Sequence, residues 1–183
     1  MLKHNVSTFS LILDQLPEVV YVGNPILRKK TKRVAVADGV TIGKQLGKVL
    51  IRYRSIAGYG RGLAAPQIGI GRSVFVTYLD DVVHTYINPV IVQRSKKHNY
   101  FRELCLSAGI FTADVQRPEW IVMKWTDENG ISHHERFDGF LARLYQHEEA
   151  HLRGIVHLDQ AEHGSIEFTS TNPLLEKLRT RKT

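Results

Sequence analysis

The feature that most constrains this chain is the string His147-Glu148-Glu149-Ala150-His151 in its C-terminal third. Residues four positions apart in an α-helix lie on one face, so the imidazoles of His147 and His151 project together and can bind one cation. Glu148 follows the first histidine directly and can reach a water molecule on that cation. This spacing is the layout of a hydrolytic metal site.

The residues around the two histidines favour a metal site. The alternative is that both histidines are buried core residues with ordinary hydrogen-bond partners and no metal. The apolar stripe of an amphipathic helix runs through Phe140 and Leu144 and continues into both histidines. Two histidines that face a core at this spacing are hard to satisfy without a shared ligand. We therefore expect them to bind a divalent metal.

Helical spacing also predicts where the helices lie. The metal helix is expected over residues 139–153, with Gly154 as its stop, and a second buried helical face spans residues 42–53. Residues 1–17 are expected to form an arm, and residues 172–181 a short helix. The expected N-caps are Asp138 for the metal helix and Asp38 or Thr41 for the second helix.

Strand-forming segments precede the metal helix. Apolar and β-branched runs are separated by polar turns, of which Asp127-Glu128-Asn129-Gly130 is a strong hairpin signal and Asn88-Pro89 a break. This order predicts an α+β fold, with antiparallel or mixed sheets packed around a central helix that carries the metal motif. The expected strands are residues 73–78, 82–87, 90–92, 120–125 and 131–137.

Length and composition indicate one domain over residues 1–183, with a basic tail over residues 160–183. Hydrophobic residues make up 43% of the 183-residue chain, which is ordinary for a soluble globular domain. We find no long apolar run at the N-terminus and predict neither a signal peptide nor a membrane span. The single cysteine, Cys105, excludes an internal disulfide.

The net charge of +7 suggests a polyanionic neighbour, and a ribosome or nucleic acid would fit. The basic residues form two clusters, and neither is interleaved with aromatic residues as a base-stacking surface would be. A solvated basic surface is therefore favoured over a sequence-specific nucleic-acid site. The clusters are Lys29, Lys30, Lys32 and Arg33, and Lys177, Arg179, Arg181 and Lys182.

The segment over residues 60–69 is rich in glycine and alanine and leaves few side chains in the way. Such a segment lets another backbone, such as a bound peptide, approach closely. An ordinary Gly-Pro loop has the same composition, and this segment alone leaves both interpretations open.

Two histidines leave a catalytic metal one protein ligand short. His157 completes H-E-x-x-H-x-x-G-x-x-H, the pattern of metzincin proteases. A metzincin needs a methionine turn after the third histidine, whereas Met1 and Met123 both precede it. The other candidate is Cys105.

Three segments resemble, in order, the signature motifs of peptide deformylases: residues 60–67, 103–107 and 146–151. Residues 24–28 and 87–89 are similar to further landmarks of that family, and the resemblance extends over residues 19–159. It implies removal of the N-formyl group from the N-terminal methionine of newly made peptides, with release of formate.

The resemblance also implies the roles of individual residues. Cys105, His147 and His151 would hold one divalent metal, natively Fe(II), with zinc, nickel or cobalt as substitutes. Glu148 would be the general base, and the Gln67 carboxamide and the Leu106 N–H would stabilise the oxyanion.

The implied partners are N-formylmethionyl nascent peptides, with the ribosome as a further partner through the basic surface, in a bacterial-type cytoplasm. The peptide would pair as an extra strand beside the Gly60 segment, with its methionine in an apolar pocket. The expected substrate-binding residues are Gly60, Arg61, Gly62, Phe101, Glu103, Leu104, Phe140, Arg143 and Leu144.

Four positions depart from the family pattern. Leu104 stands where glycine is normal, Arg61 where an apolar residue is usual, Ala150 in place of an aspartate, and His157 where an aromatic residue is common. None of these is an implied ligand or the implied base, so we expect a divergent deformylase. A member with altered substrates or no activity is the alternative, although retention of Glu148 and Gln67 favours catalysis.

Overall fold

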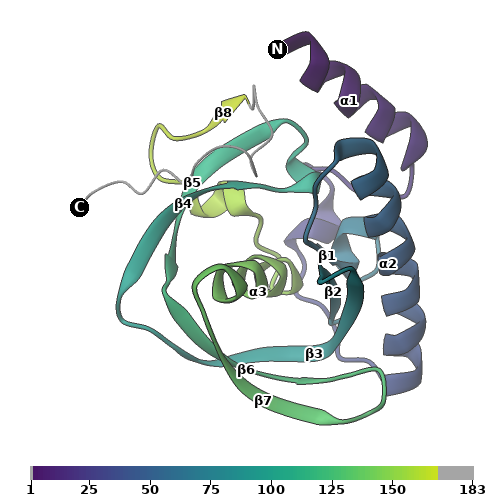
Figure 1. Ribbon diagram of the computed structural model, residues 1–183, viewed down its shortest axis with the longest axis vertical. Helices are drawn as coiled ribbons and strands as arrows, with labels where there is room; N and C mark the ends of the chain where they lie inside the picture. The colour runs from purple at the N-terminus through teal and green to yellow at the C-terminus, as the bar shows by residue number, and fades with distance from the viewer. Residues whose placement is uncertain (1, 169–183) are drawn as a thin grey trace.

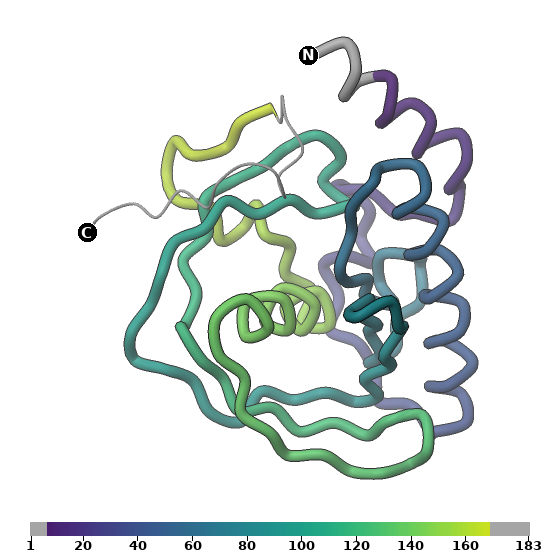
Figure 2. The backbone as a smooth tube through the Cα atoms, in the orientation of Figure 1, coloured from purple at the N-terminus to yellow at the C-terminus, as the bar shows by residue number. Residues whose placement is uncertain are grey.

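The computed structural model describes residues 2–168 and the side chains of residues 7–168. Its centre is α3 (Gly139–Leu152), the helix that carries the two histidines. Figure 1 shows α3 surrounded by strands, with α2 along one outer side, and the tube in Figure 2 follows the same path through the middle of the fold. The predicted α+β fold around a central helix is confirmed.

Two antiparallel sheets enclose α3. The larger sheet has the strand order β1-β2-β3-β6-β7 and the smaller one the order β4-β5-β8. The strands β1 and β4 are edge strands, and both lead into the site described below. The strands are β1 (Gly62–Ala64), β2 (Val74–Leu79), β3 (Val82–Arg94), β4 (His98–Leu104), β5 (Phe111–Pro118), β6 (Trp120–Thr126), β7 (Ser132–Asp138) and β8 (Glu167–Phe168).

The predicted break at Asn88-Pro89 is wrong, because β3 continues through it as a bulge. The register against β6 shifts between Ile87 and Val90, and Asn88 has a φ of 52°. Its side-chain amide bonds to both backbone groups of Val34, at 2.9 Å and 2.8 Å, which holds the bulge in place. The hairpin of β6 and β7 is formed as predicted.

Strand β5 was not predicted. Its buried positions include Asp114 and Arg117, which interrupt the apolar pattern that marks a strand. Both charges are paired, Asp114 with Arg102 at 2.9 Å and Arg117 with Glu103 at 2.6 Å. Pairing compensates the cost of burying them, so β5 forms a full ladder with β4 despite its composition.

The N-terminal arm is instead a helix, α1 (Leu2–Gln15), because it has a surface to pack on. Ile12 and Leu16 are buried in a core cluster with Leu46 and Leu50 of α2 (Val36–Ala57). The helix α2 begins before the predicted caps, with Ala35 at its N-cap. It ends at Gly58, which has a left-handed conformation with a φ of 78°.

Three glycines let α2 lie close against β3. Gly39, Gly43 and Gly47 are four residues apart and so share one helix face. A Cβ atom on Gly39 or Gly43 would lie 2.7 Å from Ile87 or 2.5 Å from Thr85. Larger residues would push α2 away from the sheet that supports β1.

The helix α3 differs from its prediction at its N-terminus. Asp138 is the N-cap residue, but its carboxylate makes no capping hydrogen bond and pairs with Arg136 instead, at 2.9 Å. Phe140 is 52% exposed, so the buried stripe includes Leu144 and not Phe140. Phe140 lies at the mouth of a cavity described below.

Short 3₁₀ turns connect several of these elements. Residues 169–183 lie outside the described residues, and with them the predicted helix over 172–181 and the second basic cluster. No helix in the described part of the chain is long and apolar enough to cross a bilayer. The turns are η1 (Pro25–Arg28), η2 (Ala65–Ile68), η3 (Leu106–Ala108) and η4 (His157–Gln160).

Candidate active site

A cysteine and two histidines meet where β4 ends against α3. The ligand atoms of Cys105, His147 and His151 all lie within 4.8 Å of one another, and the Cys105 Sγ is 3.2 Å from Nε2 of His151. Among the described residues this is the one such group of three. A thiolate with two imidazoles suits a divalent transition metal, so the residues present fit the predicted ion.

His157 is not part of this group. It is 1% exposed, its ring lies 5.9 Å from that of His147, and neither of its nitrogens has a hydrogen-bond partner within the described residues. Burial lowers the pKa of His157 to about 3, so the ring is neutral. The three-histidine alternative is therefore not the arrangement that the chain forms.

The carboxylate of Glu103 fixes the orientation of His147. It lies 2.9 Å from His147 Nδ1, which leaves Nε2 of His147 for a metal. The same carboxylate pairs with the guanidinium groups of Arg117 and Arg143. Burial raises the pKa of Glu103, but Arg117 and His147 outweigh it and hold that pKa well below its usual value, so the group is charged.

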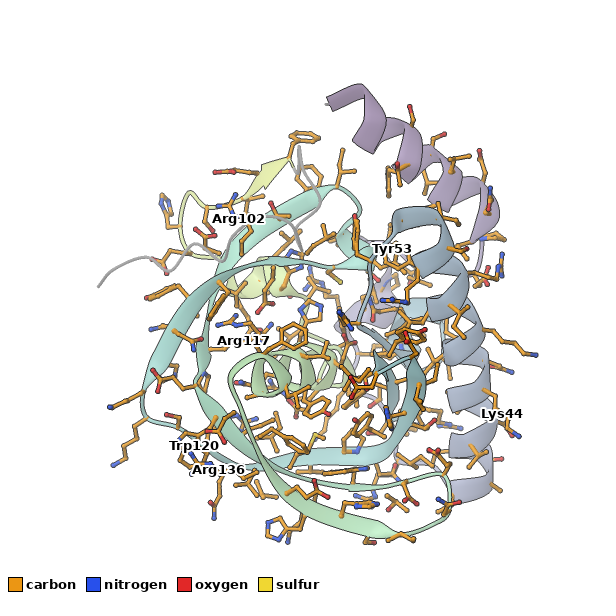
Figure 3. All side chains as sticks on the ribbon, viewed as in Figure 1. Lys44, Tyr53, Arg102, Arg117, Trp120 and Arg136 are labelled. Carbon is orange, nitrogen blue, oxygen red and sulfur yellow. The ribbon has the colours of Figure 1, made fainter. Side chains whose placement is uncertain are left out.

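Sequence reasoning missed this buried network. Glu103 and Arg143 were expected to bind substrate and Arg117 was not considered. Figure 3 shows Arg117 reaching from β5 toward α3. The available signal was position, since Ala113, Val115 and Arg117 lie at alternate positions of one strand and so share a face. A charge on the same face as buried apolar residues requires a partner.

Glu148 lies next to the ligands with one oxygen uncommitted. It is 3% exposed, and its Oε2 has no hydrogen-bond partner within the described residues. Burial raises the pKa of Glu148 to about 7, although His147 and Arg117 oppose the rise. A carboxyl group with a pKa near neutrality suits proton transfer in both directions.

Gln67 and Leu106 place two donors beside the cysteine. The Oε1 of Gln67 accepts from the Ala64 backbone N–H at 2.8 Å, which turns its Nε2 toward the Cys105 sulfur at 3.5 Å. Leu106 is the first residue of η3, and a first-turn N–H has no acceptor within its own helix. The Gln67 Nε2 also donates to the Ser107 hydroxyl at 3.3 Å, which holds the carboxamide beside the cysteine.

A cavity of about 180 Å³ opens onto this group. All nine residues predicted to bind substrate line it, together with Gln67, Glu148 and two of the predicted ligands. Tyr53 of α2 and Tyr59 also line it, and neither was predicted. Aromatic and aliphatic walls beside a metal site suit an apolar side chain held next to the reacting bond.

Comparison with known proteins identifies the family. Residues 16–166 match the model of the polypeptide deformylase family. The chain is 36% identical to the peptide deformylase of Borreliella burgdorferi over 147 residues, which cover 79% of this chain and 87% of that one. The chain belongs to the peptide deformylase family.

Solved structures of deformylases share the fold. That of Synechococcus elongatus peptide deformylase in complex with actinonin matches with a TM-score of 0.70 and 35% identity, over 80% of this chain and 79% of that one. The Thermotoga maritima peptide deformylase matches with a TM-score of 0.70 and 30% identity, over 79% and 96% of the two chains. This protein is accordingly a metal-dependent deformylase.

Two of the departures from the deformylase pattern lie beside the metal group. Leu104 ends β4, is half-buried and lines the cavity. Ala150 is fully buried next to His151, whose Nδ1 has no hydrogen-bond partner within the described residues. His151 therefore lacks an orienting contact like the one that Glu103 gives His147.

The contact between Gly62 and Glu148 leads to a prediction for this deformylase. A Cβ atom at position 62 would lie 2.3 Å from Glu148 Oε1, so Gly62→Ala must displace the carboxylate. We expect kcat/KM to fall by about 100-fold with metal content unchanged, because a misplaced group loses its reactive geometry.

The matched control for this substitution is Gly71→Ala, where no atom lies within 4 Å of the added Cβ. Deformylation kinetics and metal analysis of both variants check the prediction. Wild-type kcat/KM in Gly62→Ala would show that Glu148 is not constrained by this contact.

The buried network leads to a second prediction. Glu103→Gln should weaken metal binding by about 10-fold to 100-fold, because His147 loses its charged partner. It should also lower the free energy of unfolding by about 3–5 kcal/mol, because Arg117 and Arg143 keep buried charges without compensation. Chelator competition and urea denaturation measure the two effects.

Glu167→Gln is the control, since Glu167 pairs with Arg102 through a side chain that is 56% exposed. If Glu103 instead acts only by contacting substrate, its replacement will raise KM and leave metal affinity at the wild-type value.

Proposed function

We propose that Cys105, His147 and His151 bind the catalytic metal of this deformylase and that Glu148 is its general base. The reaction of the family is removal of the N-formyl group from the N-terminal methionine of newly made peptides. The observation that carries the assignment is the group of three ligand atoms within 4.8 Å of one another. Beside it lies Glu148, whose Oε2 has no hydrogen-bond partner in the described part of the chain.

We take the native metal to be Fe(II), with zinc, nickel and cobalt as functional or partly functional substitutes. The assignment rests on the family resemblance, since one thiolate and two imidazoles accept several divalent ions. When bound, the metal acidifies water and polarises the formyl carbonyl. Burial lowers the pKa of His151 and the nearby His147 lowers it further, which keeps the His151 ring in the neutral form that metals bind.

Proton transfer is assigned to Glu148. Its carboxylate takes a proton from the attacking water and delivers it to the nitrogen of the leaving amine. The Gln67 Nε2 and the Leu106 N–H donate to the oxygen of the formyl carbonyl as its negative charge develops. The products are formate and a peptide with a free N-terminal methionine.

The free edge of β1 is the proposed docking strand for the peptide. The backbone carbonyl of Arg61 accepts a hydrogen bond from the backbone N–H of Tyr78 in β2 at 2.8 Å. Gly62 is the next residue along the chain. Alternate residues of an antiparallel pair point their backbone groups to opposite sides, so Gly62 presents its N–H and C=O to the cavity. The methionine side chain then enters the pocket lined by Phe101, Phe140 and Leu144.

We further propose that residues 1–183 form one catalytic domain that acts in the cytoplasm near the ribosome. The support is the net charge of +7 and the exposure of the cluster formed by Lys29, Lys30, Lys32 and Arg33. Electrostatic attraction of this kind raises encounter rates with a polyanion without requiring a specific site.

The test of the activity is formate release from formyl-Met-Ala-Ser by protein prepared anaerobically with iron. An acetylated peptide and a substrate for internal peptide-bond cleavage are the controls. Release from the formyl peptide alone is expected. Cleavage of the internal bond would instead indicate a protease. No activity in any of the three assays, with metal bound, would indicate an altered substrate or loss of catalysis.

A further inference from the structure

Of the described residues that line the substrate cavity, Arg61 is the one cation without an ion pair. Three arginines line this cavity, and two of them are neutralised: Arg102 by Asp114 and Glu167, and Arg143 by Glu103. Arg61 is exposed and makes no ion pair within the described residues. Its guanidinium is therefore available to a carboxylate brought by the substrate.

The direction of β1 decides which part of a peptide meets Arg61. Gln67, whose Nε2 lies 3.5 Å from the Cys105 sulfur, follows β1, so the formyl group binds toward the C-terminal end of that strand. Gly62 lies beside Glu148, and Arg61 and Gly60 precede it, further from the reacting bond. A peptide that leaves the centre antiparallel to β1 passes Gly62 first and then Arg61 and Gly60.

The register follows from this direction. If the methionine is level with Gly62, the second residue of the peptide is level with Arg61 and the third with Gly60. An arginine side chain is long enough to reach a carboxylate at either position. We propose that Arg61 makes this deformylase prefer formyl peptides that carry an acidic side chain at the second or third residue. This inference rests on the proposed function.

The test compares isosteric peptides that differ only in charge. C-terminal amides are used so that the side chain carries the only carboxylate: formyl-Met-Asp-Ser-amide against its Asn counterpart, and formyl-Met-Ala-Asp-amide against its Asn counterpart. An exposed ion pair of ordinary strength predicts an Asp/Asn ratio in kcat/KM of about threefold to fivefold at one of the positions. The ratio should shrink as salt screens the pair.

Two variants of Arg61 and one control locate the effect. Arg61→Gln should bring the ratio to about one, and Arg61→Glu should reverse it. Lys44→Gln removes the same charge from the outer face of α2, where Lys44 points away from the fold (Figure 3), and should leave the wild-type ratio. Each ratio compares two substrates on one variant, so a general change in activity cancels.

Equal turnover of the Asp and Asn peptides by the wild type would overturn the inference, as would a preference that survives in Arg61→Gln. A preference that Lys44→Gln lowers as much as Arg61→Gln would assign it to net charge and overturn it too. If the metal-bound protein releases no formate from neutral formyl-Met-Ala-Ser-amide, the proposed function is refuted together with the inference. If it releases formate from this peptide but shows no Asp preference, only the inference about Arg61 is refuted.

Discussion

Replacing Glu148 with glutamine will lower formate release by about 100-fold to 10,000-fold, the range expected for loss of a general acid–base group. The amide has nearly the same shape but cannot accept and return a proton. Glu148 itself is not among the three grouped ligand atoms, so bound metal should stay at the wild-type stoichiometry. Steady-state kinetics and metal analysis on one preparation measure both quantities.

The stability of this variant also has a predicted direction. Burial raises the pKa of Glu148 to about 7, and its Oε2 lacks a partner within the described residues, so the carboxylate is costly to bury. Glu148→Gln should therefore unfold at the same temperature as the wild type or a higher one.

The adjacent glutamate is the control. Glu149 pairs with Arg153 at 2.9 Å and does not line the substrate cavity, so Glu149→Gln should keep its turnover. Wild-type turnover in Glu148→Gln would remove Glu148 from the mechanism, and lost metal would make it a residue that supports the ligands.

Replacing Cys105 with serine will remove most of the metal and with it the activity. A serine hydroxyl is a far poorer ligand than a thiolate for a transition metal, and two histidines alone hold such an ion weakly. Loss of the ion also removes its contribution to folding, so the melting temperature should fall to that of the chelator-treated wild type. Metal analysis and thermal denaturation test this.

His157→Phe is the matched comparison, because it replaces the other candidate third ligand with an aromatic ring. His157 is buried and lies outside the group of three ligand atoms, so this variant should retain its metal. The opposite pattern, with metal kept by Cys105→Ser and lost by His157→Phe, would establish the three-histidine site and contradict the assignment of Cys105.

Local patterns predicted much of the fold. The spacing of His147 and His151 predicted a helix that presents both rings on one face, and the turn ending at Gly130 predicted the hairpin of β6 and β7. The sequence predictions for α1 and β5 were wrong or missing for a common reason. The helix α1 and the strand β5 are stabilised by partners distant in sequence, such as Leu46 for α1 and Glu103 for β5, and a local pattern does not contain those partners.

The functional site, like the fold, was predicted from the sequence only in part. The sequence alone determined the donor chemistry, because residue types set what can bind a metal and helical periodicity sets that two histidines share a face. Only the tertiary structure brought Cys105, and not His157, into the group of three ligand atoms. It also turned Glu103 toward His147 and left Arg61, at the cavity rim, without an ion pair within the described residues. These outcomes depend on how two sheet edges close around α3, and contacts between segments so far apart are decided by packing and charge pairing.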